Sequence, residues 1–232
     1  MKLIIAGATG LGGTELIKQA LQISEITSVI ALARRPVGLD DSANPNVSKL
    51  KNVIVKDYGT IQTMTVAVTP FKTSGLNFAE IKRVCQTCPV TGFQTMYAIK
   101  PAQPFRFIYF SAEGTPQDLS KKPMMMGNYQ IIRGESEKMV CKLSETHEGA
   151  EVCILHLGVA TTYSAAMSRA LVSGIFQAAN VFTRALANIS MEQLAAAALD
   201  QSIHGFENPL ISNNEMVRIG NDALKSRKVG KS

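Results

Sequence analysis

Three residues in the middle of the chain could carry acid–base chemistry on a bound carbonyl group. Tyr129 and Arg133 are four positions apart in a segment whose apolar spacing predicts a helix, so their side chains share one helix face. A cation beside a phenol stabilises the phenolate and lowers its pKa from about 10, which makes a tyrosine a usable proton donor. Ser111, at the end of an apolar run, could hold the same substrate oxygen. A surface Tyr–Arg pair and a strand-end serine are the alternative interpretation.

A glycine-rich turn near the N-terminus is typical of dinucleotide binding. Gly7-Ala-Thr-Gly10-Leu-Gly12-Gly13 follows the first apolar run and opens a helical stretch. Glycines at such a place allow a tight turn, close approach of the backbone to a pyrophosphate, and close packing of helix on strand. The N–H groups at the helix start meet the negative charge. The alternative is a tight turn between strand and helix that holds no ligand.

The end of the second apolar run indicates which dinucleotide would bind. An acidic residue there bonds the ribose 2′-hydroxyl of NAD, whereas a cation pairs with the 2′-phosphate of NADP. The run ends in Ala33-Arg34-Arg35-Pro36, without an acid, and guanidinium groups bind phosphate bidentately. We therefore expect NADP(H) in preference to NAD(H), although two exposed arginines in a turn give the same pattern. Asp57, after the third run, is placed to accept a hydrogen bond from the adenine amino group. An aspartate exposed in a loop is an equally good interpretation of this residue.

Alternating strands and helices must position these residues. Short apolar runs predict strands at Lys2–Ala6, Ser28–Ala33, Val53–Val55, Val66–Val68, Phe107–Phe110 and Val152–Leu157. Apolar spacing predicts helices after Gly10, over Phe78–Met96 with a break or kink at Pro89, and over Asn128–His147. This repetition favours an α/β fold, a Rossmann-like doubly wound parallel sheet with helices on both faces.

The character of the sequence changes after Gly158. Residues 164–189 are alanine-rich and helical, and Ser190-Met-Glu-Gln193 is a capping box that opens another helix, which Gly205 ends. We expect residues 160–224 to form a small, mostly helical appendage over the carboxyl edge of the sheet, where ligands bind in such folds. The appendage belongs to one NAD(P)-binding domain spanning residues 1–232, with residues 225–232 as a basic, disordered tail.

Composition and charge exclude several classes of function. Of the 232 residues, 46% are hydrophobic and 18% are charged, which suits a globular core and not a disordered chain. No apolar run reaches the ~18 residues that a membrane helix needs. The net charge of +6 comes largely from four cations in residues 225–232. We expect a small-molecule substrate, no nucleic acid and no membrane as partners, and a cytoplasmic location.

The four cysteines, Cys85, Cys88, Cys141 and Cys153, are predicted to be reduced thiols that pack in helices and strands. Cys85 and Cys88 have the spacing of a redox or zinc motif. Because the other two are twelve residues apart, the second half of a zinc site is missing. We therefore expect no metal.

Together these motifs resemble the short-chain dehydrogenase/reductase superfamily, and more closely its atypical NmrA-like NAD(P)-binding members common in fungi. The resemblance spans nearly the whole chain and rests on GATGLGG, ALARRP, FIYFSA and Tyr129-Gln-Ile-Ile-Arg133-Gly-Glu, with AVTP at residues 67–70 and LDQSIHGFENPL at residues 199–210. It implies a Rossmann fold that binds NADP(H), with Ser111 and Tyr129 as the family's serine and tyrosine. The cofactor-binding residues expected are Gly7, Thr9, Gly10, Leu11, Gly13, Arg34, Arg35, Asp57, and, flanking the nicotinamide half, Val68 and Thr69.

The sequence departs from this family at three places. Arg133 stands where the family has lysine; it keeps the positive charge but cannot relay a proton. Leu157 stands where the family commonly has a proline before the glycine. Only about eight residues, 58–65, join the third predicted strand to the fourth, whereas a helical crossover needs ~10–12. We therefore expect that crossover helix to be missing, with a protein partner or self-association covering the exposed sheet face, unless the gene model is truncated.

These observations predict an NADP(H)-dependent oxidoreductase that reduces a carbonyl or enone of a small, apolar substrate. Its catalytic residues would be Ser111, Tyr129 and Arg133. A second hypothesis is a redox sensor of the NmrA kind, which binds the dinucleotide and signals through a partner without turnover. A third is a degraded paralogue that binds nothing. Arg133 and the missing crossover helix favour the second hypothesis.

Overall fold

Strands and helices alternate through most of the chain, as the sequence predicts. The computed structural model describes residues 1–38, 46–55, 78–116, 118–119, 127–157, 160–161 and 189–229. Within these ranges, no helix is both long and apolar enough to cross a membrane. The elements are β1 (Lys2–Ala6), α1 (Leu11–Leu21), β2 (Ser28–Ala33), η2 (Val47–Lys49), β3 (Leu50–Ile54), α2 (Phe78–Lys82), η3 (Arg83–Thr87), α3 (Cys88–Ala98), β4 (Phe105–Ala112), α4 (Gly127–Thr146), β5 (Ala150–Leu157), β6 (Ala160–Thr161), β7 (Ile189–Ser190), α7 (Met191–His204), β8 (Leu210–Ile211) and α8 (Asn213–Val229).

Every strand pair in the described residues is parallel, which confirms the predicted α/β fold class. One sheet has the order β1-β2-β3, a second has the order β4-β5-β8, and β6 pairs with β7. Among the described strands, none joins β1 to β4. The predicted strand Val66–Val68 lies outside the described residues. Residues 58–65, where a crossover helix was expected to be missing, also lie outside them.

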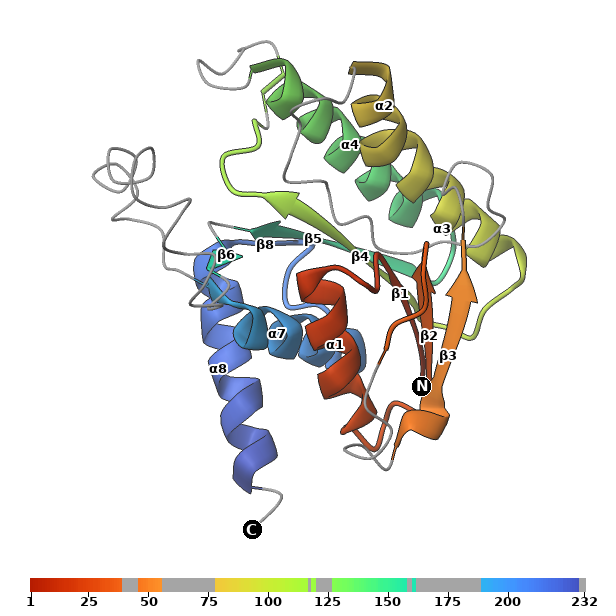
Figure 1. The fold of residues 1–232 in the computed structure, drawn as a ribbon. Helices are drawn as coiled ribbons and strands as arrows, with labels where there is room; N and C mark the ends of the chain where they lie inside the picture. The colour runs from red at the N-terminus through yellow and green to blue at the C-terminus, as the bar shows by residue number, and fades with distance from the viewer. Residues whose placement is uncertain are drawn as a thin grey trace.

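Helices lie on both sides of the strands (Figure 1). α1, α7 and α8 lie on one side, and α2, α3 and α4 lie on the other. The alternation of side chains along β4 explains this arrangement, because successive residues of a strand point to opposite faces. Ile108 and Phe110 belong to the core that includes α1 and α7, whereas Phe107 and Tyr109 pack with α3 and α4.

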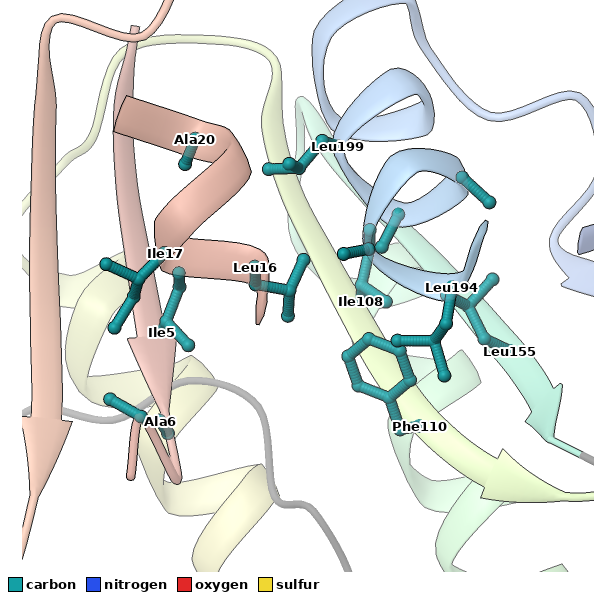
Figure 2. Packing of buried hydrophobic residues seen from close by; sticks show 14 of the residues in the cluster. Ile5, Ala6, Leu16, Ile17, Ala20, Ile108, Phe110, Leu155, Leu194 and Leu199 are labelled. Atoms are coloured by element: carbon teal, nitrogen blue, oxygen red, sulfur yellow. The ribbon is translucent and has the colours of Figure 1, made fainter. Parts of the chain in front are cut away.

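The larger core joins the two main sheets through α1 and α7. Leu16 of α1, Leu194 and Leu199 of α7 and Phe110 of β4 are all buried in it (Figure 2). Burial of one such side chain stabilises the fold by about 1.5–3 kcal/mol. A cavity of about 50 Å³ remains in this region, lined by residues of β1, β4, α1 and α7 that include Ile4 and Arg106. The packing of α1 on α7 therefore holds β1 and β4 in place relative to each other.

The helical run from residue 78 to residue 98 changes its geometry just before Pro89. α2 passes into the π-helical turn η3, and α3 follows with Pro89 in its first turn. Proline has no N–H, and its ring crowds the carbonyl four residues earlier, which is that of Cys85. A wider turn accommodates that crowding. The predicted interruption at Pro89 takes the form of this π-helical turn, and the chain stays helical from Phe78 to Ala98.

The C-terminal helix differs from the sequence prediction in two respects. α8 extends to Val229, so the expectation of a disordered tail is wrong for residues 225–229. Arg227 explains the extension, because its guanidinium donates to Gln19 Oε1 of α1 at 2.8 Å and to the Ala196 carbonyl of α7 at 3.5 Å. In addition, α7 packs on α1 and α8 packs on the α7 helix, whereas these residues were expected over the carboxyl edge of the sheet (Figure 1). The predicted helix at 164–189 falls outside the described residues, except that Ile189 begins β7.

α7 begins at the predicted capping box, and this gives a test of the fold. Ser190 Oγ accepts from the Gln193 N–H at 3.1 Å, and Gln193 Oε1 accepts from the Ser190 N–H at 2.9 Å. We expect Ser190→Ala to lower the free energy of unfolding by about 1 kcal/mol, measured by urea unfolding followed by circular dichroism. Ser24→Ala is the control, since Ser24 is exposed and bonds its neighbour Glu25. An equal loss in both variants would contradict the role of the cap.

Candidate functional site

The glycine turn connects β1 to α1 and lies against the end of β2. Gly7 has a φ of +69°, a left-handed conformation that favours glycine. The Gly10 N–H donates to the Gly7 carbonyl at 2.8 Å and closes the turn. The Ala8 N–H donates to the Leu32 carbonyl of β2 at 3.3 Å. The turn is therefore fixed both internally and to the neighbouring strand.

α1 starts close against this turn because Gly13 has no side chain. A Cβ atom on Gly13 would lie 2.5 Å from the Gly7 carbonyl oxygen and 2.9 Å from Ala8 Cα. No side chain caps α1 at Gly10, and the N–H groups of residues 11–13 have no acceptor within the helix. Such a helix start fits the diphosphate of a dinucleotide. Thr9 is half-buried in the turn, and Leu11 is 65% exposed at the first turn of α1.

The two predicted phosphate-binding arginines lie at the same edge of the sheet as the glycine turn. β1 and β2 are parallel, with Ala6 opposite Leu32, so their carboxyl ends lie side by side. Arg34 and Arg35 follow β2 directly, and both are exposed. The other predicted cofactor contacts, Asp57, Val68 and Thr69, lie outside the described residues.

A cluster of buried polar side chains lies at the carboxyl ends of β4 and β5. Ser111 Oγ donates to Glu137 Oε1, and His156 Nε2 lies 3.0 Å from the same oxygen. Ser111 and His156 are directly paired across β4 and β5, while Glu137 reaches them from α4. Their exposed fractions are 2%, 4% and 6% for Ser111, Glu137 and His156. The cluster therefore combines three elements in one hydrogen-bonded unit.

Only part of this cluster is predicted from the sequence. Ser111 is predicted as a site residue, whereas Glu137 and His156 are not. Two signals point to them: Glu137 is four residues after Arg133 on the same helix face, and His156 is a polar residue inside the apolar strand Val152–Leu157. Neither signal shows that both side chains meet Ser111, because that contact depends on how α4 packs on the sheet.

Arg133 lies inside the protein, between α4 and β4. It is 3% exposed, and its Nη2 donates to the Phe110 carbonyl at 3.3 Å. The nearby phenol of Tyr109 donates to the Cys85 carbonyl at 3.1 Å. Burial raises the pKa of Tyr109, and the charge of Arg133 partly offsets that rise. Tyr129 lies one turn before Arg133 on α4, but its side chain is outside the described part of the structure, so the contact between Tyr129 and Arg133 stays a prediction.

Cys85, Cys88 and Cys153 are buried, Cys141 is half-buried, and none of the four is in a disulfide. Burial raises the pKa of Cys85 and of Cys141, and it raises the pKa of Cys153 to about 12. A thiol is a weak nucleophile and a weak metal ligand in comparison with a thiolate. In the described ranges, no group of three or more His, Cys, Asp or Glu side chains is arranged to hold a metal ion.

Sequence comparison does not place the chain in a family. No family model matches it, and no curated protein matches it in sequence.

The fold, by contrast, is shared with solved structures of short-chain dehydrogenases/reductases. A short-chain dehydrogenase/reductase from Saccharomyces cerevisiae is 10% identical, with a TM-score of 0.66 over 92% of this chain and 96% of that one. Gre2 from Candida albicans, in complex with NADPH, is 13% identical, with a TM-score of 0.66 over 92% and 78%. A 3-oxoacyl-[acyl-carrier protein] reductase from Brucella melitensis, in complex with NAD, is 13% identical, with a TM-score of 0.59 over 94% and 97%. Likeness at these identities shows that the chain has their Rossmann-type fold.

Proposed function

We propose that the protein is an NADP(H)-dependent oxidoreductase of the cytoplasm that reduces a carbonyl or enone of a small, apolar substrate. The observation that carries this proposal is the glycine turn, in which the missing Cβ of Gly13 lets the start of α1 approach the turn closely. The two exposed arginines after β2 support the preference for a 2′-phosphate. The solved structures with NADPH and with NAD that share this fold support a nicotinamide dinucleotide as the cofactor.

In the proposed mechanism, a side chain of α4 donates the proton that the substrate oxygen receives. When bound, the nicotinamide cofactor supplies a hydride to the substrate. Tyr129, in the first turn of α4, donates the proton to the substrate oxygen. Arg133 carries a fixed positive charge one turn further along the same helix, and this charge favours the phenolate left on Tyr129. Ser111, at the end of β4, contacts the bound substrate beside Tyr129.

The first test is a calorimetric titration of the purified protein with NADPH and NADH. We expect NADPH to bind more tightly, and we expect the double variant Arg34→Ala/Arg35→Ala to raise the Kd for NADPH about ten-fold or more. The Kd for NADH should change less than two-fold, because NADH has no 2′-phosphate.

The control for this test removes two other positive charges. Lys2→Ala/Lys51→Ala changes exposed cations on β1 and β3, away from the carboxyl ends of the strands. This variant should bind NADPH as the parent protein does. Failure of a folded sample to bind either dinucleotide would overturn the proposal.

The burial of Arg133 favours a second candidate function. The guanidinium donates to the Phe110 carbonyl in the interior, and arginine cannot release a proton as lysine can. We therefore propose, as the alternative, a redox sensor of the NmrA-like kind that binds the dinucleotide and signals through a protein partner or self-association. Tight NADPH binding without NADPH oxidation across a panel of ketones, aldehydes and enones would support the sensor and contradict the enzyme.

A further inference from the structure

The two exposed arginines that follow β2 lie in a short turn, residues 33–37, which we call the arginine turn. The structure holds this turn at both ends. At its start, the Val55 N–H donates to the Ala33 carbonyl at 2.9 Å. At its end, the side chain of Val37 is only 8% exposed and packs in the larger core. The chain bends at the two arginines between these points.

The side chain of Asn52 holds the end of the arginine turn a second time. Asn52 belongs to β3, where it is paired with Ala31 of β2. Its Oδ1 accepts from the Val37 N–H at 2.9 Å, and its Nδ2 lies 3.5 Å from the Val37 carbonyl oxygen, to which it donates. A carboxamide carries both an acceptor and N–H donors. Asn52 therefore bonds the backbone of Val37 as a neighbouring strand would.

Pro36 restricts the backbone within the turn. Its ring fixes φ near −65°, and it disfavours the helical conformation for the preceding residue, Arg35. Together with the contact between Asn52 and Val37, it leaves the arginine turn few alternative conformations. Ordering a flexible segment on binding costs free energy, so a turn that is ordered beforehand binds its ligand more tightly.

We propose that Asn52 is a positioning residue for recognition of the 2′-phosphate, because it presents Arg34 and Arg35 in a preformed turn. The inference rests on the proposed function, in which these two arginines bind that phosphate. Asn52 acts on the phosphate only through the backbone of Val37. It therefore contributes to the preference for NADPH over NADH, and not to the binding of the rest of the dinucleotide.

The variant Asn52→Ala tests this role in cofactor binding. We expect the Kd for NADPH to rise about three- to ten-fold, because two arginine side chains must then be ordered on binding. The Kd for NADH should change less than two-fold, so the ratio of the NADH Kd to the NADPH Kd falls. A merely structural role would raise both Kd values together and leave this ratio unchanged. Calorimetric titration gives both values.

Thr27→Ala is the matched control. Thr27 Oγ1 donates to the Met1 carbonyl at 3.1 Å, so it also bonds the backbone of a neighbouring segment. Thr27 precedes β2, whereas the arginine turn follows it, and Thr27 and Asn52 are both exposed. The control variant should therefore lose one exposed hydrogen bond and keep the ratio of the parent protein.

Limited trypsin digestion tests the hold on the turn without any cofactor. Trypsin cleaves after arginine and lysine but poorly before proline, so the bond between Arg34 and Arg35 is its site in the turn. Residues 36–48 contain no arginine or lysine. Cleavage of a native chain requires local opening, and we expect its rate at this bond to rise about three-fold or more in Asn52→Ala. Mass spectrometry of the fragment that ends at Arg34 gives the rate, and Thr27→Ala should match the parent protein.

The outcomes separate this proposal from the proposed function. An unchanged ratio of the two Kd values in Asn52→Ala, or an equal rise of both, overturns the positioning role. Cleavage after Arg34 at the rate of the parent protein also overturns it. If the parent protein binds neither dinucleotide, the proposed function fails. Faster cleavage in Asn52→Ala alone would then still support the hold of Asn52 on the arginine turn.

Discussion

Gly13→Ala is expected to lower the free energy of unfolding by about 1–3 kcal/mol and to abolish tight binding of NADPH. The added Cβ would lie 2.5 Å from the Gly7 carbonyl oxygen and 2.9 Å from Ala8 Cα. Because these are backbone atoms, α1 must move away from the turn, and overpacking of this kind is costly. The same movement shifts the N–H groups at the helix start away from the diphosphate. Thermal unfolding and an NADPH titration measure the two effects.

Gly12→Ala is the matched control for the effect on stability. A Cβ on Gly12 meets only Leu194 Cδ2, at 3.8 Å, which is ordinary contact. Because alanine favours a helix over glycine by up to about 1 kcal/mol, this variant should be as stable as the parent protein or slightly more so. Equal unfolding temperatures for Gly13→Ala and Gly12→Ala would contradict this prediction. They would show that α1 and the turn leave room for a side chain at residue 13.

Tyr129→Phe is expected to lower kcat for carbonyl reduction by about a hundred- to ten-thousand-fold, as loss of a general acid does. The binding of NADPH should be unchanged, because the phenol acts on the substrate oxygen. Steady-state oxidation of NADPH with the best carbonyl from the panel gives kcat, and the titration gives the affinity for the cofactor. A variant that keeps the kcat of the parent protein would remove Tyr129 from the mechanism.

Tyr109→Phe is the control, because it also removes one phenol near Arg133. The Tyr109 hydroxyl donates to the Cys85 carbonyl in the interior. We expect this variant to lose about 1 kcal/mol of stability and to keep its kcat. A large loss of kcat in Tyr109→Phe but not in Tyr129→Phe would show that Arg133 acts on Tyr109. That result would contradict the proposed mechanism.

Local patterns predicted the elements that depend on local chemistry. β1 and β2 have the predicted bounds, since short apolar runs between turn residues leave little choice. The capping box at Ser190 and the end of α7 at Gly205 were also predicted, because caps are properties of a few neighbouring residues. β8 was not predicted: its two residues, Leu210 and Ile211, form a strand only by pairing with β5.

The site was predicted less completely than the fold. The glycine turn could be identified because its function requires a particular residue at each position. The contact of Ser111 with Glu137 and His156 could not be predicted, since it joins residues 19 to 45 positions apart from β4, α4 and β5. The same reason explains the error at residues 225–229. A basic sequence is typical of a solvated tail, but Arg227 finds partners on α1 and α7.

The packing of α1 on α7, with a hydrogen bond from α8, has a consequence for synthesis on the ribosome. Arg227 meets Gln19 across 208 positions of sequence, and Gln19 also donates to the Glu192 carbonyl. α7 and α8 are synthesised long after α1, so the apolar side chains of α1 that pack on α7 stay uncovered until residues 191–204 have been made. Contacts of such high sequence separation slow folding, and exposed apolar surface invites aggregation. The core between α1 and α7 can therefore close only once both helices have been synthesised.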